Sequence, residues 1–125
     1  TLYSPCDGKV IDLVDGNSDL EPGVMDEEYP AGNYLVIEMN DYNASVVLAH
    51  IQKKSYFVEK GSIVKKGQPL AEVGNSGNTS APHLHIHVVM NKTGDLLFSG
   101  QGIPMKFNNR FLCRNDKVYL MVQSK

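Results

Sequence analysis

Three of the four histidines in this 125-residue chain stand at alternate positions, at His83, His85 and His87, within the segment HLHIHV. Side chains two residues apart on a β-strand point to the same face, so a strand here would present all three imidazoles together. Its apolar residues would then point to the core. Imidazole nitrogens bind divalent metals such as zinc at about 2.0–2.1 Å. The segment therefore predicts part of a metal site, and a solvated polar face on an edge strand is the alternative.

The fourth histidine, His50, ends another apolar segment, SVVLAH. If that segment forms a strand beside HLHIHV, all four histidines gather in one place. The loop GNSGNTSAP, residues 74–82, leads into the histidine segment and contains two glycines and a proline. Such a loop would place the histidines at the mouth of a strand, where functional residues are commonly found. An ordinary connecting loop would explain the glycines but not the histidines that follow.

Short apolar segments separated by Gly, Pro, Asn and Asp run along the chain and predict a mainly β protein. No segment keeps a helical period of 3.6 residues over three turns. A hairpin is predicted around the turn NDYN, and the polar residues 15–33 predict a long loop. The predicted strands are residues 8–14, 34–39, 44–50, two short segments within 55–74, residues 83–90, and in the tail 96–99 and 117–122.

The composition is that of one folded domain, with 42% hydrophobic residues and a formal net charge of −2. Because there is no basic excess, we expect no nucleic-acid partner. No apolar run approaches roughly 18 residues, the length of a membrane helix, and from the opening residues TLYSPCDGK we expect no signal peptide within this segment. We therefore expect no membrane insertion by this segment. Cys6 and Cys113 could pair or could remain two free thiols.

The order of motifs along residues 3–90 resembles peptidase family M23, the LytM or lysostaphin-like zinc metallopeptidases. SPCDGKVIDL is similar to the strand that opens the family's core, and AGNYLVIEM and VVLAHI are similar to the strands that follow. VEKGSIVKKGQPLAEVG resembles the next pair of hairpins, and a Gly-rich loop then leads into PHLHIHV. The resemblance implies a two-sheet β-sandwich of the barrel-sandwich hybrid type, built on a duplicated hybrid motif, with an open groove across one sheet.

In that family the second histidine of the H-x-H motif binds zinc, and this position is His85 here. The resemblance gives His83 and His50 the catalytic roles, as general base and as stabilisers of the tetrahedral oxyanion beside a metal-bound water. It implies a metalloendopeptidase that hydrolyses stem or bridge peptides of bacterial peptidoglycan. It also implies an extracellular, periplasmic or cell-wall-associated location, and we expect a monomer.

The chain departs from the family pattern in its metal ligands. The family has a further His and Asp before the opening strand, whereas this chain has no histidine before His50. We interpret residues 1–125 as one M23-like domain that lacks its N-terminal metal-ligand segment, with 91–125 as a C-terminal extension. Zinc would then be absent or weakly held until ligands upstream of Thr1 are present. The alternative is an inactive, zinc-free relative that activates or tethers a cell-wall hydrolase.

Other residues and rival folds complete the prediction. His87 has no counterpart in the family pattern and is expected to face solvent rather than to serve as an improvised ligand. Four acidic residues of loop 15–33 could approach the groove but are expected to be solvated rather than to bind metal: Asp19, Asp26, Glu27 and Glu28. A lipoyl or biotinyl carrier is a lesser alternative, because VEKGSIVKKGQPLAEVG also resembles its hairpins, but the turn NDYN lacks a lysine to modify. A cupin metal site would need a histidine downstream, and none follows His87.

Overall fold

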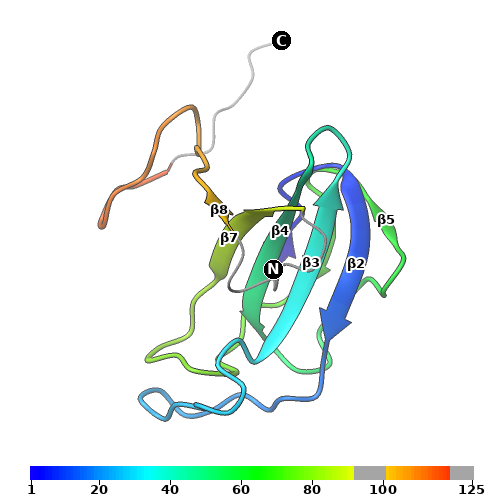
Figure 1. The fold of residues 1–125 in the computed structure, drawn as a ribbon. Coiled ribbons are helices and arrows are strands. Elements are labelled where there is room, and N and C mark those ends of the chain that lie inside the picture. The colour runs from blue at the N-terminus through cyan, green and yellow to red at the C-terminus, as the bar shows by residue number, and fades with distance from the viewer. Residues whose placement is uncertain (92–100, 119–125) are drawn as a thin grey trace.

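The computed structural model describes residues 1–91 and 101–118, and every regular element within them is a β-strand. Six strands form one antiparallel sheet in the order β5-β2-β3-β4-β7-β8, and β1 pairs with β6 in a second sheet (Figure 1). The predicted mainly β, two-sheet fold is thereby confirmed. The strands are β1 Leu2–Tyr3, β2 Gly8–Val14, β3 Asn33–Met39, β4 Ala44–Ile51, β5 Ile63–Val64, β6 Pro69–Ala71, β7 His85–Met90 and β8 Gly102–Ile103.

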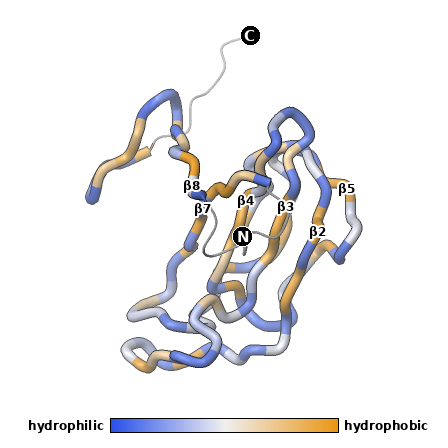
Figure 2. The backbone as a smooth tube through the Cα atoms, viewed as in Figure 1, coloured by the Kyte–Doolittle hydropathy of each residue, from blue (hydrophilic) through white to orange (hydrophobic). Residues whose placement is uncertain are grey.

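The main core lies on one face of the six-stranded sheet. Alternate residues of β3 and β4 point to this face, where Leu35, Ile37 and Leu48 are fully buried against residues of β2, β5 and β6. Each such side chain stabilises the fold by about 1.5–3 kcal/mol relative to an exposed position. On the other face, Val36 and Val47 form a smaller cluster. Figure 2 shows the hydrophobic residues running along β3 and β4 and the hydrophilic turn that joins them.

Strands 8–14, 34–39 and 44–50 are confirmed to within one residue, and β7 lies beside β4 as predicted. The histidine strand is shorter than predicted, because β7 begins at His85 rather than at residue 83. Ala49, opposite His85, is the last residue of β4 that pairs with β7, so Leu84 has no strand partner. Leu84 is accordingly 37% exposed instead of lying in the core.

The tail differs from the prediction and lies partly outside the described residues. A short strand, β8, pairs with β7 at residues 102–103 and was not predicted. The predicted strand 96–99 falls outside the described residues, and residues 117–118 are not in a strand. Figure 1 shows residues 104–118 beyond β8, outside the two sheets. None of the described residues forms a helix with the length and apolarity that a bilayer crossing requires.

Asn33, the first residue of β3, anchors the long loop that precedes it. Its side chain is fully buried, and Oδ1 accepts hydrogen bonds from the backbone N–H groups of Gly16 and Asn17, at 3.0 and 2.9 Å. Its Nδ2 donates to the carbonyls of Asn17 and Ile51, at 2.7 and 3.0 Å. Its backbone N–H donates to Oγ of Ser76. One amide therefore joins the loop, the end of β4 and the loop after β6.

The two cysteines are both free in the structure. Cys6 is half-buried and packs against the main core, whereas Cys113 is exposed in the tail. Burial raises the pKa of the Cys6 thiol, and the neighbouring carboxylate of Asp7 raises it further. Of the two alternatives left by the sequence, the structure therefore has the unpaired one.

We expect iodoacetamide to modify Cys113 at least about tenfold faster than Cys6 in the native protein at neutral pH. Alkylation proceeds through the thiolate, and both the burial and the raised pKa of Cys6 suppress that form. Mass spectrometry of peptides from briefly labelled protein measures the two rates. The rates should converge in urea, and equal rates in the native protein would contradict the half-buried position of Cys6.

Candidate functional site

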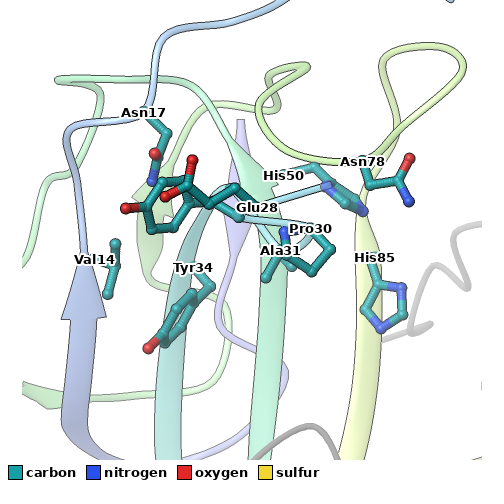
Figure 3. A pocket seen from close by; sticks show the side chains of 12 residues that line it. Val14, Asn17, Glu28, Pro30, Ala31, Tyr34, His50, Asn78 and His85 are labelled. Atoms are coloured by element: carbon teal, nitrogen blue, oxygen red, sulfur yellow. The ribbon is translucent and has the colours of Figure 1, made fainter. Parts of the chain in front are cut away.

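A groove of about 700 Å³ lies at the end of the large sheet where β2 and β4 end and β3 and β7 begin (Figure 3). It matches the open groove that was predicted for one sheet. Figure 3 shows His50 and His85 on one side and Val14, Tyr34 and Glu28 toward the other. The groove is lined by Val14, Asn17, Glu28, Tyr29, Pro30, Ala31, Gly32, Tyr34, Ala49, His50, Asn78 and His85.

A β-bulge turns His50 toward this groove. The ladder between β3 and β4 pairs Asn33 with Ile51 and then Tyr34 with Ala49, so His50 is an extra residue between two pairs. Its φ is 63°, in the left-handed region that non-glycine residues rarely adopt. Strict alternation along β4 would have sent His50 to the core. The bulge instead places its ring in the groove, at a backbone cost of about 1–2 kcal/mol.

Hydrogen bonds hold His50 in that conformation and fix its protonation. Its backbone N–H donates to the carbonyl of Ala31, and Nδ1 lies 2.8 Å from the carbonyl oxygen of Ser76. A carbonyl can only accept, so Nδ1 of the neutral ring carries the proton and Nε2 keeps a lone pair. His50 is 7% exposed. Its imidazole is therefore an oriented, buried base.

Two glycines let the loops around this histidine close on each other. Gly32 and Gly77 both have positive φ, at 59° and 85°. A Cβ atom on Gly32 would clash with the backbone of Ser76, and one on Gly77 would clash with the backbone of Gly32. Ser76 is held further by its hydroxyl, which donates to the carbonyl of Ile51 at 2.8 Å. This contact positions the carbonyl that orients His50.

His83 precedes β7 and is oriented in the same way as His50. Its Nδ1 lies 2.8 Å from the carbonyl oxygen of Ala81 and 3.0 Å from the hydroxyl oxygen of Thr79. The carbonyl again requires a proton on Nδ1 of the neutral ring, which leaves the lone pair on Nε2. The centroids of the His83 and His50 rings are 4.8 Å apart. Two imidazoles with matching tautomers therefore lie side by side.

His85 and His87 complete the cluster from β7. The centroid of the His85 ring lies 5.8 Å from that of His50 and 5.0 Å from that of His87. The structure thus brings together all four histidines, as predicted. His87, which was expected to face solvent, is half-buried and contacts the His85 ring.

Partial desolvation in the groove lowers the pKa of His50, and the neighbouring imidazole of His83 lowers it further, against the raising effect of the Ser76 carbonyl. The pKa of His85 is lowered by desolvation and by the other three histidines. The lowered pKa values favour the neutral form of both rings, which is the form that binds a metal or accepts a proton.

Acidification from about pH 8 to about pH 5.5 should lower the free energy of unfolding of the metal-free protein. The unfolded chain protonates its histidines near the ordinary pKa of about 6.5, whereas the pKa values of His50 and His85 lie lower in the fold. Their stabilising contribution is present above that pH and is lost as the pH falls through the folded values. Urea denaturation at both pH values measures the change. A His50→Asn/His85→Gln double variant should depend less on pH, and an unchanged dependence would contradict the assignment.

The acidic residues of the long loop serve its structure rather than forming a ligand set. Asp26 Oδ1 accepts the backbone N–H groups of Glu28 and Tyr29, and Asp19 Oδ1 accepts that of Asn75. Glu28 also lines the groove. Glu28 is one of the four loop residues that the sequence offered as candidates to approach the groove, and the fold of the loop brings it there.

The side chains at the groove are of the type that binds zinc, but they are not arranged as a complete zinc site. Neutral imidazole is a preferred zinc ligand, and the cluster offers several of them. Across residues 1–91 and 101–118, however, no three His, Cys, Asp or Glu side chains are placed to hold one metal ion together. A four-coordinate zinc at this groove would need donors in addition to those that these residues supply.

Comparison with known proteins gives the same family that the motifs suggested. The model of Peptidase family M23 matches residues 1–96. Peptidoglycan DD-endopeptidase ShyB of Vibrio cholerae serotype O1 is 39% identical over 128 residues, which cover 98% of this chain and 26% of ShyB. ShyA of the same organism is 32% identical over 68 residues, or 54% of this chain and 15% of ShyA. The chain thus spans about a quarter or less of the length of these curated relatives.

Solved structures agree with this match. The catalytic domain of the antimicrobial peptidase lysostaphin from Staphylococcus simulans aligns with a TM-score of 0.61 and 25% identity, over 81% of this chain and 65% of that domain. A zinc-containing peptidase from Vibrio cholerae aligns with a TM-score of 0.54 and 36% identity, over 71% of this chain and 23% of that protein. The two-sheet arrangement seen here is therefore the fold of these peptidases.

Proposed function

This chain belongs to peptidase family M23, and from that premise we propose that it carries the catalytic groove of a zinc-dependent endopeptidase that cleaves peptide crosslinks of bacterial peptidoglycan. The observation that supports the proposal most strongly is the pair of adjacent imidazoles of His50, which lines the groove, and His83, each oriented by a backbone carbonyl. Relatives named as peptidoglycan DD-endopeptidases support the substrate class. Such a substrate would place the protein in the periplasm, in the cell wall or outside the cell.

In this proposal His85 is the zinc ligand of the chain, and His50 and His83 are its catalytic residues. Zinc, when bound with further ligands, would supply a Lewis acid and a water with a pKa of about 7. His83 Nε2 has the lone pair needed to take a proton from the attacking water. Once protonated, an imidazole can donate to the developing oxyanion or return the proton to the departing amine. His50 Nε2, on the adjacent ring, can share either role.

One observation favours a second function: the described residues include no group of three side chains that could hold a metal ion. In that alternative the domain is a zinc-free member of the family. It would use the same groove to bind a peptide and to activate or tether another cell-wall hydrolase. The two functions differ in whether the full-length protein that carries this chain holds zinc.

Replacement of His85 by alanine in that full-length protein should remove both bound zinc and peptidoglycan hydrolysis. Metal analysis of the purified protein and release of soluble peptides from purified peptidoglycan measure the two effects. Leu84→Ala is the matched control, because Leu84 is the exposed neighbour of His85 outside the groove lining. Zinc retained in His85→Ala would refute the ligand assignment. A wild-type protein that holds no zinc when zinc is supplied would favour the binding domain.

A further inference from the structure

His85 and His87 form a direct hydrogen bond along β7. Nε2 of His85 lies 2.8 Å from Nδ1 of His87, and the two rings stand nearly perpendicular, at 81°. One imidazole must donate and the other must accept, because two protonated or two unprotonated nitrogens would repel each other at this distance. The bond therefore links the protonation of the two rings.

Only one of the two directions of this bond leaves His85 able to bind a metal. If Nδ1 of His87 donates, Nε2 of His85 accepts, and the proton of neutral His85 must sit on Nδ1. Both nitrogens of His85 would then be occupied. If Nε2 of His85 donates instead, Nδ1 of His85 keeps its lone pair for a ligand.

The other two histidines of the site obtain their orientation from backbone carbonyls. His50 donates to the carbonyl of Ser76, and His83 donates to that of Ala81. For His85, the acceptor within hydrogen-bonding distance is the side chain of His87. His87 is half-buried on β7 opposite Val47, so its ring is held by the sheet rather than by a mobile loop.

We propose that His87 is a positioning residue for His85, accepting its Nε2–H and thereby presenting Nδ1 of His85 to zinc. The inference rests on the proposed function, in which His85 is the zinc ligand. Metal-bound histidines generally donate their second N–H to a nearby acceptor, which fixes both the tautomer and the ring orientation. Loss of such an acceptor typically weakens metal binding by 10–100-fold.

The test compares two variants of His87 in the full-length protein. His87→Ala removes the acceptor, whereas the amide oxygen of His87→Asn can occupy nearly the position of Nδ1. Met90→Ala is the control, because Met90 is half-buried on the same strand, away from the His85 ring. Competition with a chromogenic chelator gives the zinc dissociation constant. It should rise about 10–100-fold in His87→Ala, recover in His87→Asn and stay unchanged in Met90→Ala.

A second measurement needs neither zinc nor activity. With histidine-selective ¹⁵N labelling, NMR of the metal-free protein at a pH where His85 is neutral should locate its proton on Nε2 in the wild type. In His87→Ala the same spectra should show a mixture of the Nδ1–H and Nε2–H tautomers. An unchanged zinc dissociation constant in His87→Ala, or a wild-type proton on Nδ1 of His85, would overturn the inference. The proposed function would survive either result if His85→Ala still loses zinc. A wild-type protein that does not bind zinc would instead contradict both the role of His87 and the proposed zinc-dependent function.

Discussion

Replacement of His83 by alanine should lower kcat for peptidoglycan hydrolysis by about 10²–10⁴-fold and leave the zinc content of the full-length protein unchanged. The carbonyl of Ala81 holds the proton of His83 on Nδ1, so Nε2 is prepared to accept another. In the proposed mechanism this ring takes the proton of the attacking water, whereas His85, the proposed zinc ligand, keeps its position on β7. Steady-state kinetics and metal analysis on the same preparation separate the two effects.

His50 and Thr79 supply the comparison for that experiment. His50→Asn should lose activity to a similar extent without unfolding, because Asn tolerates the left-handed backbone that His50 adopts. Thr79→Val removes one of two contacts of His83 Nδ1 and keeps the Ala81 carbonyl, so we expect a loss below about tenfold. Nearly normal kcat in His83→Ala or His50→Asn, with zinc bound, would exclude that residue from catalysis.

Replacement of Asn33 by alanine should reduce the free energy of unfolding by about 3–5 kcal/mol, a large part of the roughly 5–15 kcal/mol that stabilises a typical domain. The substitution leaves unpaired the N–H groups of Gly16 and Asn17 and the carbonyl of Asn17. The carbonyl of Ile51 loses one of its two donors and keeps the Ser76 hydroxyl. The Asn33 side chain that makes these bonds is fully buried. Urea denaturation followed by circular dichroism measures the change.

Two further variants separate the amide of Asn33 from the loop itself. Asn33→Asp keeps the acceptor but turns a carboxylate oxygen toward two carbonyls, so we expect it to be nearly as destabilising as alanine. Asn17→Ala should change stability little, since Asn17 contacts Asn33 only through its backbone. A loss below about 1 kcal/mol in Asn33→Ala would mean that the loop is not anchored by this amide.

The sequence was sufficient for features that depend on local pattern. Alternating apolar residues predicted β2, β3 and β4, and the spacing of His85 and His87 predicted that they lie on one face of a strand. The loop residues 74–82 also predicted that His83 would sit at a strand entrance, although the strand begins two residues later. These features follow from neighbours in the chain, which the sequence displays directly.

The remaining features depend on contacts between distant segments. His50 faces the groove only because a bulge interrupts the alternation of β4, and that bulge depends on pairing with Asn33 and Tyr34 of β3. Glu28 reaches the groove only because the long loop folds back over the sheet. The role that we infer for His87 depends on which ring donates in the hydrogen bond between His85 and His87. These features cannot be predicted from the periodicity of the sequence, because each depends on contacts that form only in the fold.

Hydrogen bonds attach the long loop before β3 to the rest of the protein on both sides of an exposed tip. Asn33 holds Gly16 and Asn17, the backbone of Leu20 pairs with that of Asn75, and Asp26 N–H donates to the carbonyl of Gly77. The five residues 21–25 between these fastenings are all exposed. Segments of other length or sequence could therefore be grafted at 21–25 without disturbing the histidines. Exchange of this tip between relatives offers a modular way to alter the protein surface without changing the residues that line the groove.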